Sequence, residues 1–248
     1  MHSAVPSIRI IKRASSEVFL LLLRIVMKFI RSIKELEPVE PNGKSVVYML
    51  GYGGRIWQAK RHIRILLNEG YQVITLDFID ILKNHDPQDL ISLMDEVSKY
   101  LKEKDLISKE TILLGVSLGG LVGYNLIRKH KELNKLLVIT GGDMTHIPSK
   151  RALKNKWKIT HSKLSQVWNQ VNIYTEPSMM KNKHVVMLLP KRDRVINPSQ
   201  VRHEIAKHTT ANDFTLVSTN GGHFRTIITE TILLPKRSLK YIKQLERF

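Results

Sequence analysis

The stretch TILLGVSLGG at residues 111–120 decides how this 248-residue chain is expected to fold. It joins an apolar run to a G-x-S-x-G pattern centred on Ser117, and a segment of helical character follows. A serine at a sharp strand-to-helix turn exposes its hydroxyl above a sheet, and the helix behind it favours developing negative charge. The stretch therefore predicts a strand, a tight turn with a candidate nucleophile, and a helix. The alternative is an ordinary strand–helix turn, because short motifs also match by accident.

The composition is that of a single globular domain with one sizeable core, since 42% of the residues are apolar. Cysteine is absent, which excludes thiol nucleophiles, disulfides and cysteine-bound zinc. The absence of cysteine suits a reducing compartment, so we expect a cytoplasmic protein, with a peripheral position at the membrane as the alternative.

The charge balance is strongly basic, with 40 Lys and Arg against 22 Asp and Glu and a net charge of +18. Such a field attracts nucleic acid, acidic lipid headgroups or negatively charged substrates. Nothing in the chain matches a helix-turn-helix, zinc-finger or RNP pattern, so no specific nucleic-acid partner is expected.

The N-terminal segment is basic and amphipathic. Within residues 18–36, four polar residues recur at helical spacing among apolar ones, which predicts a helix that either packs on the domain or lies on a membrane surface. The longest uncharged run, 18–23, is far short of the roughly 18 residues that a spanning helix needs, and no secretory cleavage site follows. We therefore expect residues 1–43 to form this helix and a hinge before a domain over residues 44–248; in the membrane alternative, residues 1–36 make the contact with the lipid.

From Lys44 onward, short apolar runs alternate with longer amphipathic segments, as in βα units with a parallel sheet buried on both faces. The pattern predicts a doubly wound, mostly parallel α/β sheet of about six strands. A long excursion over residues 141–183 breaks this rhythm and is expected to form a helical lid. The expected strands are 46–50, 72–76, 111–114, 135–140, 184–189 and 214–218, and the expected helices 56–69, 87–104, 118–130, 198–207 and 224–245, the last interrupted at Pro235.

A serine hydroxyl needs a base to act as a nucleophile near neutral pH, and that base needs an orienting acid. Asp193 and His223 each stand a few residues past one of the last two expected strands. Active sites of open α/β sheets form at the carboxyl ends of strands, and the order Ser, Asp, His is the one expected on this scaffold. Asp143 follows the preceding strand and is an alternative acid.

The oxyanion of an acyl-transfer intermediate also needs hydrogen-bond donors. The Leu118 N–H at the start of the helix is one candidate, and the glycine-containing loop at residues 51–54 would supply the other, because glycine allows main chain to approach a ligand.

Over residues 44–248 the sequence resembles the α/β-hydrolase superfamily. The resemblance implies that Ser117 is the nucleophile, His223 the base and Asp193 the orienting acid, with the amides of Leu118 and Tyr52 as oxyanion donors. It also implies that residues 141–183 roof the site.

Two features depart from the family pattern. Leu50 precedes Gly51 where the family often has a histidine, and the family's usual first two strands are replaced by the expected N-terminal helix.

The expected function is therefore hydrolysis of a small-molecule carboxylic ester or related acyl compound through an acyl-enzyme, without a metal or organic cofactor. The basic N-terminus makes a membrane-proximal lipase or esterase a coherent version of this expectation. The alternative from another class is a catalytically inactive hydrolase-fold protein that binds a small ligand, an anionic partner or a membrane surface.

Overall fold

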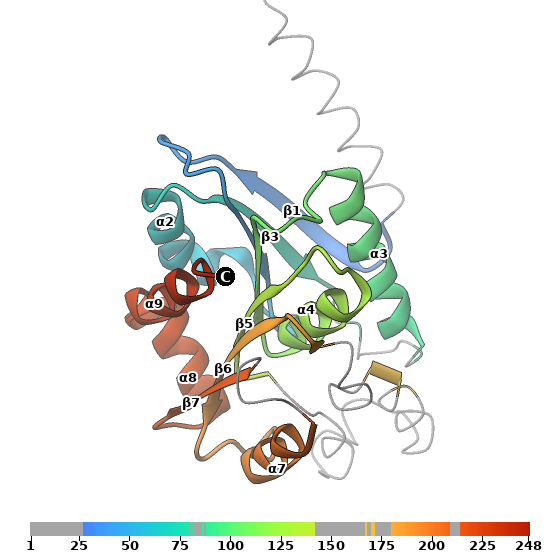
Figure 1. Ribbon diagram of the computed structural model, residues 1–248, viewed down its shortest axis with the longest axis vertical. Helices are drawn as coiled ribbons and strands as arrows, with labels where there is room; N and C mark the ends of the chain where they lie inside the picture. Colours follow the sequence, from blue (N-terminus) through green and yellow to red (C-terminus); the bar gives the residue numbers. More distant parts are fainter. Residues whose placement is uncertain are drawn as a thin grey trace, which may run out of the picture.

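The computed structural model describes residues 27–79, 81, 86, 88–141, 167, 170–171, 180–208 and 214–248. These residues form a seven-stranded sheet with helices on both faces (Figure 1). The order is β1-β3-β2-β4-β5-β6-β7, with β1 antiparallel to β3 and the other pairings parallel. The strands are β1 (Ile30–Leu36), β2 (Ser45–Met49), β3 (Gln72–Phe78), β4 (Thr111–Val116), β5 (Lys135–Ile139), β6 (His184–Pro190) and β7 (Phe214–Thr219).

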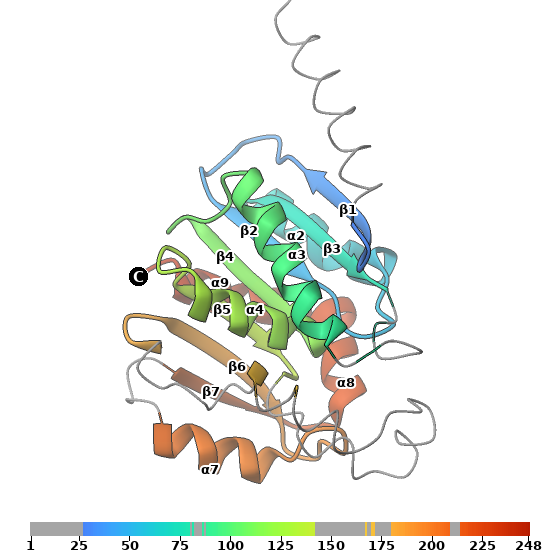
Figure 2. The same cartoon turned by 90° about the vertical axis from the view of Figure 1, so that its right-hand side faces the viewer.

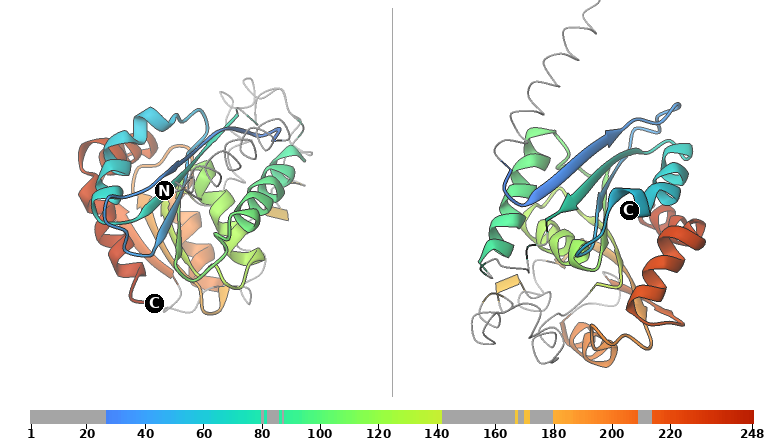
Figure 3. Two further views of the ribbon diagram at one scale, coloured as in Figure 1. Left: turned by 90° about the horizontal axis from the view of Figure 1, so that it is seen from above. Right: turned by 180° about the vertical axis from the view of Figure 1, so that it is seen from behind.

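The two faces of the sheet carry separate layers of helices. The central strands are apolar on both sides, so that in β2 the side chains of Val47 and Met49 join one core and those of Val46 and Tyr48 the other. Figures 2 and 3 show α3 and α4 on one side of the sheet and α2 and α9 on the other. The helices are α2 (Lys60–Asn68), α3 (Asp89–Glu103), α4 (Leu118–Lys129), α7 (Pro198–His208), α8 (His223–Ile228) and α9 (Pro235–Leu245), with a 3-10 turn η1 (Ile56–Ala59) and a π-helical turn η4 (Thr229–Leu233).

This arrangement confirms the predicted doubly wound α/β class. The six parallel strands lie within two residues of the predicted runs at each end. Continuous Val, Ile and Leu runs are what a strand needs when helices cover both of its faces, which is why these runs identified the strands so closely. Pro235 begins α9 after a break at η4, as predicted.

The strand β1 is an addition to the predicted sheet and a correction to the expected N-terminal helix. Residues 30–36 are extended and pair with β3, so the helix predicted over residues 18–36 is wrong for this part. Arg31 and Glu35 are four residues apart, and this spacing puts two side chains on one face in a strand as well as in a helix. Pairing also closes an edge of β3 that would otherwise expose its backbone groups.

Contacts from the helical layer fix β1 in this position. The Glu96 carboxylate on α3 accepts hydrogen bonds from the N–H groups of Lys28, Phe29 and Ile30 at 3.0 to 3.2 Å. Glu35 accepts from the Tyr100 hydroxyl at 2.8 Å. The first residue of β1 and the two residues before it are thereby attached to α3.

Two other expectations fall outside the described residues: the N-terminal segment before residue 27, and most of the lid expected over 141–183. No helix in the described part of the chain is long and apolar enough to cross a membrane.

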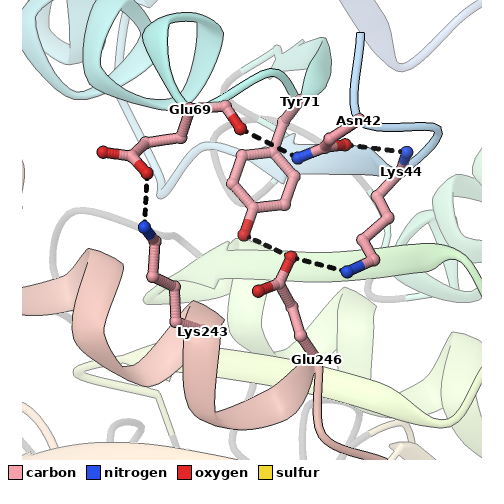
Figure 4. Close-up of polar contacts among 6 residues, drawn as sticks. All are labelled: Asn42, Lys44, Glu69, Tyr71, Lys243 and Glu246. Atoms are coloured by element: carbon pink, nitrogen blue, oxygen red, sulfur yellow. Dashed lines mark hydrogen bonds and ion pairs between the residues drawn. The ribbon is translucent and has the colours of Figure 1, made fainter.

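A polar network joins the end of α9 to the beginning of β2 (Figure 4). The Glu246 carboxylate accepts hydrogen bonds from the Tyr71 hydroxyl at 2.7 Å and from Lys44 Nζ at 2.9 Å, while Lys243 pairs with Glu69. Partial burial would raise the pKa of Glu246, but the hydrogen bonds from Tyr71 and Lys44 outweigh it and lower that pKa. The C-terminal helix is thus held at the edge of the sheet where β2 starts.

Candidate active site

The turn between β4 and α4 holds Ser117 in a strained conformation. Its φ is +51° and its ψ is −111°, a backbone conformation that residues other than glycine rarely adopt. The turn needs glycine on both sides, because a Cβ on Gly115 would lie 2.4 Å from the Gly119 carbonyl oxygen and one on Gly119 would lie 2.2 Å from the Met49 oxygen. The Ser117 N–H donates to the Ile139 carbonyl of β5 at 3.0 Å. The G-x-S-x-G pattern thus builds a sharp elbow whose geometry β2 and β5 support.

The three side chains predicted for the site form one hydrogen-bonded series. His223 Nε2 lies 3.0 Å from Ser117 Oγ, and His223 Nδ1 lies 2.8 Å from Asp193 Oδ2. A carboxylate only accepts, so the imidazole carries its proton on Nδ1 and donates it to Asp193. The lone pair on Nε2 then faces Ser117 and accepts from its hydroxyl.

The Asp193 carboxylate is fixed on its other oxygen as well. Asp193 Oδ1 accepts from the N–H groups of Val195 at 2.7 Å and Ile196 at 2.9 Å. The side chain has no solvent exposure. The orientation of Asp193, and through it that of the imidazole, is therefore set by the backbone of its own loop.

The loops that carry Asp193 and His223 continue the pairing of β6 with β7. The Lys191 N–H donates to the Thr219 carbonyl and the Arg192 N–H to the Gly221 carbonyl, both at 3.0 Å. Asp193 follows immediately, and His223 begins α8 after Gly222. The pairing register of β6 and β7 therefore sets the distance between the Asp193 carboxylate and the His223 imidazole. Asp143, the alternative acid, lies outside the described residues.

The loop after β2 passes directly beside the elbow. The Gly54 N–H donates to the Gly51 carbonyl at 2.9 Å, which closes a tight turn around Tyr52. A Cβ on Gly51 would lie 3.2 Å from the Cβ of Ser117. Leu118 is the first residue of α4, where an N–H has no partner within its own helix. Both elements expected to supply oxyanion donors thus border Ser117.

Two residues that support this loop were missed at the sequence level. The Arg55 guanidinium donates to the Gly54 carbonyl at 3.0 Å and lies 3.8 Å from the buried Asp77 carboxylate at the end of β3. Arg31 of β1 approaches the same carboxylate at 3.2 Å. The available signal was Asp77 itself, a lone charge in an apolar strand. The long-range pairing that explains it depends on β1, which was predicted as helix.

Two further features of the described residues do not involve the three side chains of this site. A pocket of about 450 Å³ between α3 and α4 is bordered by Ile91, Asn125 and Val171, among others, and by none of the three site residues. In the same part of the chain, no cluster of three His, Asp or Glu side chains is arranged to hold a metal ion.

No known family profile matches the chain, and no curated protein matches its sequence. Its structure is similar to that of a probable hydrolytic enzyme from Pseudomonas aeruginosa (16% identity, TM-score 0.59, over 86% of this chain and 88% of that one). It is also similar to an esterase from Pyrococcus furiosus (20%, 0.59, 87% and 90%) and to α/β hydrolase domain-containing protein 10 from mouse (15%, 0.63, 88% and 98%). The chain has the α/β-hydrolase fold.

These likenesses confirm the resemblance seen in the sequence as far as the fold. The α/β-hydrolase sheet of this chain begins with the antiparallel β1, which corrects the expectation that a helix stands in place of the first strands.

Proposed function

We propose that the chain is a serine hydrolase that cleaves a small carboxylic ester or related acyl compound. The observation that carries the proposal is the hydrogen-bonded series from Ser117 Oγ through His223 to the buried Asp193, with the serine on a strained elbow. A hydroxyl and an imidazole at 3.0 Å, with a carboxylate on the opposite ring nitrogen, meet the geometric requirement for an activated nucleophile.

In the first half of the reaction, Ser117 Oγ attacks the acyl carbon while His223 Nε2 takes the hydroxyl proton. Asp193 stabilises the imidazolium that forms, and the amides of Leu118 and Tyr52 bind the oxyanion. Collapse of the tetrahedral intermediate breaks the bond to the alcohol, which leaves with the proton from His223.

In the second half, His223 takes a proton from water, and the resulting nucleophile attacks the acyl carbon bound to Ser117. Collapse releases the carboxylic acid and returns the proton to Ser117. Neither half requires a metal or organic cofactor.

The choice of an ester rests on two supports. Alcohols leave more readily than amines, so an ester needs only the groups described. One of the similar structures is an esterase, which favours the same reaction class for this fold.

The experiment is covalent labelling with a fluorophosphonate, followed by mass spectrometry of the intact chain. We expect one label per chain, lost in Ser117→Ala and strongly reduced in His223→Ala. Ser238→Ala is the matched control, because Ser238 also lies 3.0 Å from a histidine Nε2 but in the fully buried core. A protein that stays inert to the probe, or a label that survives Ser117→Ala, would favour a non-catalytic binding protein instead.

A further inference from the structure

Exposed apolar side chains gather on one part of the surface. Seven large hydrophobic side chains are exposed among the described residues, and five of them lie on η1, α8 and η4 or at the residue that follows η4. We call these five the apolar patch: Trp57 (72% exposed), Phe224 (70%), Ile228 (45%), Leu233 (54%) and Leu234 (51%). Such clustering distinguishes the patch from single exposed apolar residues, which are common on any protein.

The backbone brings the members of the patch together. Phe224 and Ile228 are four residues apart on α8 and so share one face of that helix. The π-helical turn η4 continues α8 to Leu233, and η1, which carries Trp57, packs against η4. Arg61 of α2 strengthens this junction, because its guanidinium donates to the carbonyl groups of Ile232 and Leu233 at 3.1 Å.

The patch reaches the candidate active site. The Phe224 ring lies with its centroid 5.4 Å from that of the His223 imidazole, at an edge-to-face angle of 79°. Trp57 follows the oxyanion loop around Tyr52 by only a few residues. A surface that covers the patch would therefore lie close to the histidine of the candidate active site.

The segments that carry or flank the patch, residues 55–68 and 223–245, are strongly basic. Their exposed or half-exposed cations are Arg55, Lys60, Arg61, Arg64, Arg225, Lys236, Arg237, Lys240 and Lys243, the last of which pairs with Glu69. Over residues 55–68 and 223–245 the only acidic residue is Glu230, which is buried and lies 3.6 Å from Arg237. Exposed aromatic and aliphatic side chains on the same segments as many exposed cations form the kind of surface that an anionic lipid bilayer recognises.

We propose that this patch docks the protein on an anionic lipid surface, with the apolar side chains inserted at the headgroup boundary and the surrounding cations on the lipid phosphates. A second copy of the chain is a poorer occupant, because two such basic surfaces repel each other. Nucleic acid would use the cations but would leave the leucines and Ile228 without a partner. The docking needs no catalysis, so it stands apart from the proposed hydrolase activity.

The proposal concerns a different surface from the membrane contact expected through residues 1–36. Residues 1–26 lie outside the described part of the chain, and residues 30–36 form β1. An experiment must therefore report from the patch itself, in the full chain.

The absence of cysteine makes a site-specific probe straightforward. We would place one cysteine by Ile228→Cys, label it with the fluorophore NBD, and add vesicles of phosphatidylcholine with phosphatidylglycerol. The matched control is Val39→Cys, since Val39 is 99% exposed in the loop between β1 and β2. We expect a blue-shifted, several-fold brighter emission at position 228 only, quenched by lipids brominated near the headgroup. Vesicles of phosphatidylcholine alone should give a much smaller change.

Three results would overturn the proposal. The first is an unchanged probe at position 228 when anionic vesicles are present. The second is an equal response at position 39. The third is a buried emission at position 228 without vesicles, or one that appears as protein concentration rises, because then the chain itself or a second copy covers the patch.

A pair of variants tests the contribution of the patch to affinity. Trp57→Ser with Leu233→Ser should weaken vesicle binding by at least ~10-fold, because both side chains lose apolar burial. Val39→Ser should leave binding unchanged. Ser117→Ala should bind vesicles like the unmodified chain while losing its fluorophosphonate label, which separates a failure of docking from a failure of the proposed function. Equal binding by the patch variant and the control variant would contradict the docking surface.

Discussion

Three serine–histidine pairs are hydrogen-bonded among the described residues, and two of them have the same separation but different surroundings. Ser117 Oγ lies 3.0 Å from His223 Nε2 at the carboxyl end of the sheet, and Ser238 Oγ lies 3.0 Å from His62 Nε2 inside the layer formed by α2 and α9. Distance alone does not distinguish them. Their hydrogen-bond partners do.

In the buried pair, the hydrogen bond between serine and histidine runs in the opposite direction, from the imidazole to the hydroxyl. Ser238 Oγ lies 2.8 Å from the Pro235 carbonyl oxygen and 3.1 Å from that of Glu230, so its single proton goes to a carbonyl. His62 Nε2 must then donate to Ser238. Its Nδ1, 3.3 Å from Tyr48, accepts from the phenol, whose pKa is raised by burial.

The comparison shows what turns a serine–histidine contact into a candidate nucleophile. At the site, a carboxylate fixes the imidazole proton on the nitrogen facing away from the serine. At the buried pair, a phenol fixes it on the nitrogen facing the serine. His62 therefore has no lone pair with which to activate Ser238. We interpret this pair as a polar connection between α2 and α9, and the following experiments test the contrast.

Removing the two serines should give the largest difference. Ser117→Ala should lower kcat/KM for a water-soluble ester by at least ~10³-fold, because it deletes the proposed nucleophile. Ser238→Ala should leave kcat/KM near its original value but lower the free energy of unfolding by ~1–3 kcal/mol, since the buried His62 N–H loses its acceptor. Ester hydrolysis and urea unfolding of both variants provide the measurement. Comparable activity losses in the two variants would mean that the pairs are not functionally distinct.

Replacing Asp193 tests directly which imidazole nitrogen of His223 must carry the proton. Asp193→Asn should lower kcat by about 10³- to 10⁴-fold, because the amide can donate to His223 and favour the wrong tautomer. The fold should be retained, so circular dichroism serves as the control. A variant that keeps most of its activity would show that Asp193 is not the orienting acid, and would return attention to Asp143.

The features of the fold and the site that could be predicted are those encoded in short stretches of the sequence. The parallel strands follow from continuous apolar runs, and Ser117, Asp193 and His223 follow from one motif and from their places after strands. What remained hidden depends on partners far apart in sequence. His62 and Ser238 are separated by 176 residues, and neither carries a pattern that names the other.

The strand β1 was missed for a different reason. Over seven residues, a stripe of polar residues four apart fits a helix and a strand equally well. The choice was made by the open edge of β3 and by the Glu96 carboxylate on α3, which receives the backbone N–H groups at the start of the strand. No feature within residues 18–36 carries that information.

The buried histidine should give the protein a pH-dependent stability. Burial lowers the pKa of His62 from 6.5 to about 4, so the folded chain keeps it neutral while the unfolded chain binds a proton below pH 6.5. Its contribution is therefore complete above pH 6.5 and is lost as the pH falls toward 4, by roughly 3 kcal/mol in total.

The measurement is urea unfolding of the wild type and of His62→Gln across this range. The variant should be less stable at pH 7, and the difference between the two proteins should shrink as the pH falls. A difference independent of pH would show that His62 titrates normally in the folded chain.

The smallest effect is expected where a tyrosine hydroxyl meets a group that water can still reach. Tyr71→Phe removes the hydrogen bond to Glu246, but that carboxylate keeps Lys44 and partial access to solvent (Figure 4). We expect a loss of only about 1 kcal/mol in the free energy of unfolding. Tyr48→Phe deletes the same atom in the dry core and leaves His62 Nδ1 without its donor, so its loss should be larger, at ~1–3 kcal/mol. Urea midpoints at pH 7 compare the two. If Tyr71→Phe proves the more damaging, the strength of these hydrogen bonds depends on the charge of the acceptor more than on the exclusion of water.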